Sequence, residues 1–277
     1  MTQPKSQKAG WEIFHPPQEL RAALERAPSV QCAGSTDDLF DLVTRQCEQG
    51  LASVAYDLPD GTRYEEVRVA DVRNGVAVNY TEPYMRRRDP ECMVIADDEP
   101  SDKDRFRDRF GKEFDDLRRD TFEWLAGQDL AVFAFKSGWR GLGDDALAVA
   151  PANAAFFPLG LALLQGILPL EDIPDDFSPE LLIVVAPPFR HTAFDGKQVV
   201  VHNRGPSKYE IFSYNLYPGP SAKKGVYGSL IHAGDEEEWV AAHCSAVRVV
   251  TPYDNIVTIM HEGASGGGKS EMLEQPH

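Results

Sequence analysis

The feature that most restricts the fold of this chain is a glycine-rich segment close to the end of the sequence. Residues 263–270 read Gly-Ala-Ser-Gly-Gly-Gly-Lys-Ser, which fits the pattern G-x-x-x-x-G-K-[ST]. The run Ile256–Met260 before it is rich in β-branched residues and predicts a buried strand, and Ser270–Glu274 after it can begin a helix. A strand, a glycine loop and a helix in this order predict the α/β class.

The residue types of this segment suit the binding of nucleotide phosphates. Glycines let backbone N–H groups turn toward phosphate oxygens, a lysine neutralises the outer phosphates, and a serine hydroxyl completes the ligand shell of Mg²⁺. We therefore predict that ATP or GTP, together with Mg²⁺, binds at Gly263, Ser265, Gly266, Gly267, Gly268, Lys269 and Ser270. A flexible tail of glycine and serine is the alternative interpretation of the same residues.

Two groups of residues upstream of this loop also carry chemistry. Tyr217 precedes the adjacent lysines Lys223 and Lys224 in a segment rich in glycine and proline. The lysines suit either an anion site or a solvated surface. His243 stands beside Cys244, and it suits either a metal ligand or a buried, hydrogen-bonded side chain.

Taken in order, these segments resemble the phosphoenolpyruvate carboxykinases. The resemblance is clearest over 217–270, where the tyrosine and lysine pair, a His-Cys-Ser-Ala sequence, a strand and the glycine loop follow one another. It implies that Lys224, as a neutral amine, and His243 hold Mn²⁺, and that Ser270 contacts the metal of the nucleotide. It also implies that Tyr217 and Lys223 face the substrate or the transferred phosphoryl group.

The same resemblance implies a function for a basic segment in the first half of the chain. Residues 86–90, Arg-Arg-Arg-Asp-Pro, resemble the family's Arg-Ser-Pro segment before a strand, which here is 92–96. The resemblance implies that Arg88 binds the carboxylate of oxaloacetate or phosphoenolpyruvate, because a planar guanidinium suits bidentate pairing. A surface run that balances the acidic segment after it is the alternative. The chain departs from the family pattern at Ser221-Ala222 and at Val247, which bears on the identity of the substrate.

The resemblance also implies the organisation of the chain. We expect residues 1–238 to form a mixed-sheet α/β domain like the carboxykinase N-terminal substrate domain. Residues 239–277 are expected to begin a P-loop nucleotide-binding domain that this sequence leaves incomplete, so the chain would be the front part of a larger protein. An incomplete domain is expected to expose apolar strand edges.

Hydrophobic periodicity and turn residues predict the other elements. The expected helices are 17–26, 36–46 and a long amphipathic one within 97–120, and the expected strands are 52–57, 65–72, 76–80, 92–96, 130–135, 181–186 and 198–202. Two polar clusters, Arg190-His191 and residues 202–204, match nothing in the family pattern, and we interpret them as structural.

Charge and composition restrict the partners and the compartment. The chain has 28 Lys and Arg against 44 Asp and Glu, a formal net charge of −16. This balance argues against nucleic acid and against an anionic membrane surface as partners, whereas a local basic pocket can still attract a small anionic substrate. The four cysteines lack paired spacing, and the N-terminus has no apolar signal segment. We expect a cytoplasmic protein with reduced thiols, and its oligomeric state stays open.

The sequence thus predicts nucleotide- and divalent-metal-dependent phosphoryl transfer of the carboxykinase type, a lyase or kinase activity, with an acceptor like oxaloacetate or phosphoenolpyruvate. Two alternatives stay open. One is a nucleotide-dependent kinase or regulatory protein with a different acceptor. The other is a catalytically inactive fragment that only binds ligand.

Overall fold

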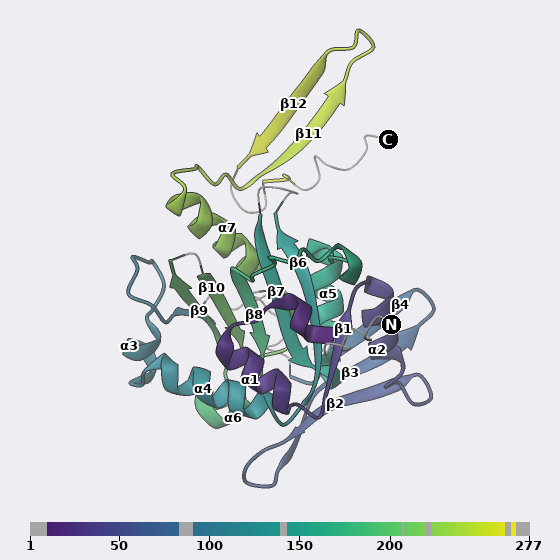
Figure 1. Ribbon diagram of the computed structural model, residues 1–277, viewed down its shortest axis with the longest axis vertical. Coiled ribbons are helices and arrows are strands. Elements are labelled where there is room, and N and C mark those ends of the chain that lie inside the picture. Colours follow the sequence, from purple (N-terminus) through teal and green to yellow (C-terminus); the bar gives the residue numbers. More distant parts are fainter. Residues whose placement is uncertain are drawn as a thin grey trace, which may run out of the picture. The chain divides into compact units, whose positions relative to one another are not determined.

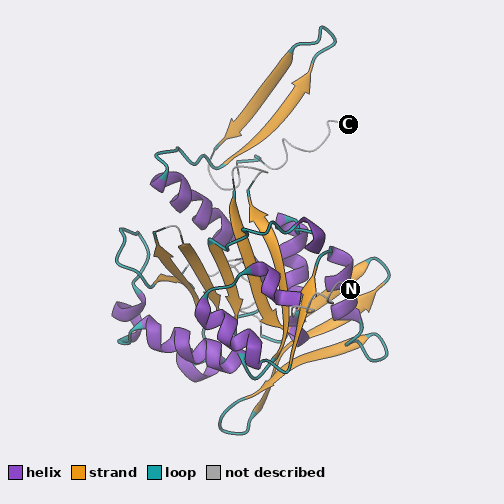
Figure 2. Cartoon of the chain, in the orientation of Figure 1, coloured by secondary structure: helices purple, strands orange, loops and turns teal. Residues whose placement is uncertain are grey.

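The computed structural model describes residues 10–82, 91–138, 143–206, 208–219, 223–263 and 267–269. The chain divides into two compact units, Met1–Leu230 and Ile231–His277. The fold is α/β, as predicted (Figures 1 and 2).

A curled, mixed seven-stranded sheet forms the centre of the first unit (Figure 1). Its strands, in their order across the sheet, are β1 (Ser29–Ala33), β6 (Asp129–Ser137), β7 (Asp144–Pro151), β8 (Leu181–Val185), β10 (Lys208–Ser213), β9 (Val200–Gly205) and β5 (Met93–Ile95). β1 pairs in parallel with β6, β7 with β8, β8 with β10, and β5 with β9, whereas β6–β7 and β10–β9 are antiparallel.

Both faces of this sheet are covered, which explains why its central strands read as continuous apolar runs. In β6, Ala131, Phe133 and Phe135 face one core, and Leu130 and Val132 face the other. The second core is formed with η1 (Gly10–Phe14), α1 (Gln18–Arg26), α3 (Phe106–Phe110), α4 (Phe114–Leu125) and α6 (Phe189–Phe194).

The first core lies beneath two helices and a separate small sheet. The helices are α2 (Thr36–Thr44) and α5 (Phe156–Gln165), and the antiparallel sheet consists of β2 (Leu51–Asp57), β3 (Arg63–Val72) and β4 (Gly75–Tyr80). Short 3-10 helices, η3 (Ala152–Ala154) and η4 (Leu170–Asp172), complete this unit. Ser35 caps α2 by accepting a hydrogen bond from the backbone N–H of Asp38, in a capping box.

One predicted helix was wrong in its bounds. Within 97–120 the structure has α3 and then α4, which begins at Phe114 and continues to Leu125. The break is at Gly111, which ends α3 in the left-handed conformation at φ 65°. Glycine adopts this conformation without steric cost, so the aromatic periodicity runs across two helices instead of one.

The second unit contains the end of α7 (Lys224–Glu236) and a hairpin of β11 (Cys244–Val250) and β12 (Ile256–Glu262). The predicted strand at Ile256–Met260 is therefore present, but its burial was wrong. Ile256 is 56% exposed and Met260 is 60% exposed. β12 pairs with β11 alone among the described strands.

Gly143, just before β7, lies close enough to the backbone of Ser137 to give a stability prediction. A Cβ atom built on Gly143 would lie 2.3 Å from the backbone oxygen of Ser137, whereas one on Gly160, inside α5, meets nothing within 4 Å. We expect Gly143→Ala to lower the free energy of unfolding by about 1–3 kcal/mol because the backbone must shift. Gly160→Ala is the matched control and is expected to raise it by up to about 1 kcal/mol. Urea denaturation of both variants measures this, and equal effects would contradict it.

Candidate functional site

The glycine-rich loop starts directly after β12, and its described residues are Gly263 and Gly267–Lys269. The Nζ of Lys269 donates a hydrogen bond to the backbone oxygen of Gly263, at 2.8 Å. Gly268 has φ 79°, a left-handed conformation that favours glycine. The first glycine and the lysine of the motif therefore meet. Ser265, Gly266 and Ser270 lie outside the described residues.

The His-Cys-Ser-Ala sequence leads into the hairpin of the second unit. His243 precedes β11 and is exposed, and Cys244 begins the strand. Within the hairpin, Ser245 stands opposite His261, and its hydroxyl lies 3.4 Å from Nδ1 of that histidine. His243 and the glycine loop belong to the same compact unit.

Three predicted site residues follow the carboxyl end of β10 in the first unit: Tyr217 and Lys223, expected to face the substrate, and Lys224, expected to hold Mn²⁺. The ring of Tyr217 packs edge-on against Tyr80, with centroids 5.9 Å apart. The hydroxyl of Tyr80 donates to the backbone oxygen of Leu216, at 3.2 Å. Lys223 and Lys224 are exposed, and Lys224 begins α7. Arg88 lies outside the described residues.

A buried amide stands at the same strand end. Asn215 is fully buried, and its Oδ1 accepts a hydrogen bond from the backbone N–H of Tyr217, at 2.9 Å. Its Nδ2 has no hydrogen-bond partner among the described residues. The amide therefore fixes the backbone that carries Tyr217.

The first polar cluster, Arg190-His191, which we interpreted as structural, is part of a buried ion cluster near Tyr80 whose carboxylates the sequence did not predict. Arg190 is fully buried and donates from Nη2 to Glu66, at 3.0 Å, with Glu82 also within 3.5 Å. His191 places Nε2 3.1 Å from the same Glu66 carboxylate, and the ring of Tyr64 covers His191 with centroids 3.8 Å apart. A second donor of Arg190 bonds to the backbone oxygen of Gly196, at 2.5 Å.

The topology brings this cluster to the sheet edge that carries Tyr217. Arg190 and His191 are in α6, which follows β8, and β8 runs parallel to β10. Thr81, next to Tyr80, donates hydrogen bonds from its N–H and its hydroxyl to the backbone oxygen of Glu66. The carboxyl ends of neighbouring parallel strands are where open α/β sheets place ligands.

The environment of His191 favours its neutral form. Burial and the adjacent Arg190 lower the pKa of His191, and the carboxylates of Glu66 and Glu82 oppose this shift. When Nε2 carries the proton, it donates to Glu66 and leaves Nδ1 with a lone pair. This is the arrangement of an imidazole oriented by a carboxylate.

The second polar cluster, residues 202–204, is structural, as we interpreted it. His202 is buried, and its Nδ1 lies 2.6 Å from the hydroxyl of Tyr209. Its Nε2 has no hydrogen-bond partner among the described residues. Arg204 pairs with Asp97 at 2.7 Å.

The burial of His202 gives a prediction for pH dependence. Burial, with a smaller contribution from Arg204, lowers the pKa of His202 to about 3, and Asp97 opposes the shift. An unfolded histidine titrates near pH ~6.5, so between these values the unfolded state binds more protons and stability falls as the pH drops. We expect His202→Gln to lose less stability than the wild type from about pH 6.5 to pH 4. Urea denaturation across this range measures the effect, and identical slopes would contradict the prediction.

Lys224, His243 and Ser270 are the residues that we predict to bind metal ions. Within the parts of the chain that the structure describes, no three or more His, Cys, Asp or Glu side chains gather in a metal-binding group. Lys224 and His243 belong to different compact units, and Ser270 is outside the described residues. Their metal roles stay predictions.

Of the described helices, none is both long and apolar enough to cross a membrane.

The chain was compared with known families and with curated proteins. A family model described as "Domain of unknown function (DUF4914)" matches residues 16–277. No curated protein matches the chain.

Proposed function

The chain belongs to the DUF4914 family, whose description gives no function. From the chain's own residues, we propose that it binds a nucleoside triphosphate at 263–270 and takes part in phosphoryl transfer. The loop of the second unit would hold the nucleotide phosphates. Residues after β10 in the first unit would contact a small anionic acceptor. The proposal keeps ATP and GTP as alternatives.

The observation that carries the proposal is the hydrogen bond from Lys269 to Gly263. It joins the lysine of the motif to the first glycine, directly after β12, and Gly268 has a conformation that a side chain would strain. A phosphate oxygen is a stronger acceptor for an ammonium group than a backbone oxygen, since both partners are then charged. We infer that the phosphates of the nucleotide replace the Gly263 oxygen as the partner of Lys269.

The part of the proposal that concerns the phosphoryl acceptor rests on the carboxykinase resemblance and on the position of Tyr217. Tyr217 is fixed by Tyr80 and Asn215, and the exposed side chains of Lys223 and Lys224 follow the same strand. These groups suit oxaloacetate as the anionic acceptor, with its carboxylate bound by Arg88. Loss of CO2 from oxaloacetate would give an enolate that takes the γ-phosphoryl group of the nucleotide, with phosphoenolpyruvate and the nucleoside diphosphate as products. A bound nucleotide with its divalent cation would supply the phosphoryl group and neutralise charge. Each group of residues would position the reactant that it contacts.

The test is a pair of measurements on the purified protein. Equilibrium binding of a fluorescent ATP or GTP analogue, with Mg²⁺ or Mn²⁺ present, is expected to be saturable and to be reversed by unlabelled nucleotide. Turnover is then followed with oxaloacetate as acceptor. The absence of nucleotide binding would contradict the proposal. Nucleotide turnover that ignores oxaloacetate would keep the nucleotide site and point to a different acceptor.

A further inference from the structure

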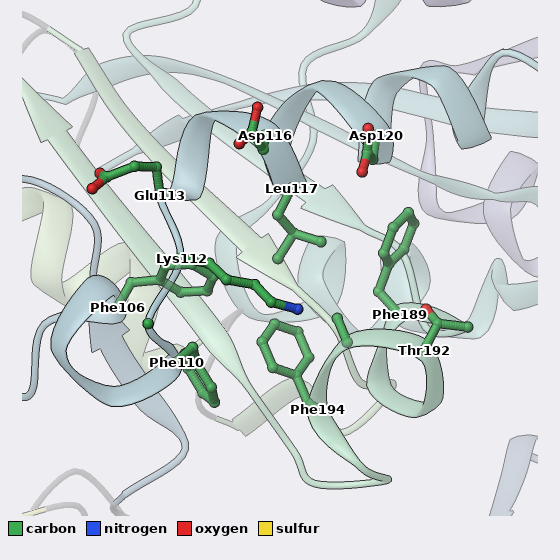
Figure 3. A pocket seen from close by; sticks show the side chains of 12 residues that line it. Phe106, Phe110, Lys112, Glu113, Asp116, Leu117, Asp120, Phe189, Thr192 and Phe194 are labelled. Atoms are coloured by element: carbon green, nitrogen blue, oxygen red, sulfur yellow. The ribbon is translucent and has the colours of Figure 1, made fainter.

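The first unit contains a pocket of about 550 Å³ between α3, the start of α4 and α6 (Figure 3). Pockets for small molecules have volumes of roughly 300–1,000 Å³ and are mainly apolar with a few polar groups. The apolar lining consists mostly of aromatic rings: Phe106, Phe110, Leu117, Phe189 and Phe194. The pocket lies wholly outside the segments to which we assign phosphoryl transfer.

The aromatic lining is held firmly by contacts between the rings. Phe110 packs against Phe106 and Phe194, with centroid distances of 5.0 Å and 4.9 Å. Phe106 and Phe194 are also buried in the second core. The left-handed Gly111 then turns the chain so that Lys112 stands at the pocket. The apolar surface is therefore formed before any ligand arrives.

The polar lining carries charges of both signs. Figure 3 shows the ammonium group of Lys112 pointing into the pocket between Leu117 and the ring of Phe194. Glu113 and Asp120 lie along the α4 side. Asp116, a third carboxylate of the lining, pairs with Arg119 at 2.8 Å. Neither Lys112 nor Glu113 has a hydrogen-bond or ion-pair partner among the described residues. Among the described residues, the carboxylate of Asp120 has only a distant ion pair, with Arg119 at 4.0 Å.

We propose that this pocket binds a free amino acid with an aromatic or large aliphatic side chain. The side chain would lie on the phenylalanine rings, the α-carboxylate would pair with Lys112, and the α-ammonium group would pair with the carboxylates of α4. A ligand with only a carboxylate would face those carboxylates without a counter-charge, and a ligand with only an amine would face Lys112. A zwitterion with an apolar body complements both charges and the lining.

The experiment uses L-phenylalanine as the probe in isothermal titration calorimetry. Two matched analogues, 3-phenylpropionate and 2-phenylethylamine, each lack one charge, and L-alanine lacks the apolar body. We expect each of the three to bind about tenfold more weakly than L-phenylalanine or worse, because each loses one of the groups that the pocket complements. Equal binding of either analogue, or the absence of saturable binding by L-phenylalanine, would overturn the proposal.

Variants of the exposed rim residues locate the binding without threatening the fold. Lys112→Met and Asp120→Asn are each expected to weaken the binding of L-phenylalanine about fivefold or more, as charged hydrogen bonds are lost. Lys208→Met, an exposed lysine in β10 outside the pocket, is the matched control and is expected to bind like the wild type. Unchanged binding in both rim variants would place the ligand elsewhere and overturn the proposal. Nucleotide binding is measured in parallel, since its outcome is independent of this pocket.

Discussion

Replacing Glu66 by glutamine is expected to lower the free energy of unfolding by about 3–5 kcal/mol, because it leaves a buried guanidinium without its main counter-charge. Glu66 is 1% exposed and Arg190 is 0% exposed, so water cannot take the place of the lost carboxylate. Glutamine keeps the size of the side chain, which separates the loss of charge from the creation of a cavity. Urea denaturation at neutral pH measures the change.

The adjacent residue provides a matched control on the same strand. Glu65 pairs with Arg68 at the surface, at 2.8 Å, where the arginine side chain is 66% exposed. Exposed pairs contribute about 0–1 kcal/mol, so Glu65→Gln is expected to change the stability by less than about 1 kcal/mol. Similar losses in the two variants would show that the ion cluster around Arg190 is not the source of the effect.

Replacing Lys269 by alanine is the second large effect that we expect, and it acts on function. If the lysine binds the nucleotide phosphates, its removal should reduce turnover by at least about 100-fold, as for other groups that stabilise charge during the reaction. The fold should be kept, because the hydrogen bond to Gly263 is exposed. Nucleotide binding and steady-state turnover measure the effect.

The control for this variant is Lys208→Ala, which removes an exposed lysine from β10 in the other compact unit. It is expected to leave nucleotide binding and turnover unchanged. If the Lys269→Ala variant kept wild-type turnover, this would contradict our proposal that the loop binds the nucleotide phosphates. Weakened binding in both variants would indicate a general effect of positive charge and not a site.

Helices and strands that are marked by local patterns, such as turn residues or a run of apolar residues, could be predicted from the sequence. The turn residues at 59–61 and 74–75 separate the three predicted strands that the structure has as β2, β3 and β4. The helix predicted at 17–26 is α1, and the apolar run from 130 lies in β6. Periodicity could not show the break at Gly111, since glycine continues or ends a helix according to its surroundings.

The carboxylate that pairs with Arg190 could not be predicted, for a different physical reason. Strict alternation along β3 would place Glu66 on the face opposite Val67, pointing away from the core. The pairing of β2 with β3 instead shifts between Val54 and Ala55: Val54 pairs with Val67 and Ala55 pairs with Glu65. Glu66 is the extra residue of this bulge, and it turns inward. A bulge depends on how two strands meet, which a single sequence does not reveal.

The order of strands in the large sheet has a consequence for how the chain folds. The small sheet joins consecutive strands, so it can form from local contacts. β1 pairs with β6, and the hydrogen bond from Ser29 to Asp129 closes a separation of 100 residues. Non-local parallel pairing is slow because the loop must be ordered first. During synthesis on the ribosome, β1 therefore waits for β6 with neither of its edges paired, and in this interval the nascent chain is open to aggregation.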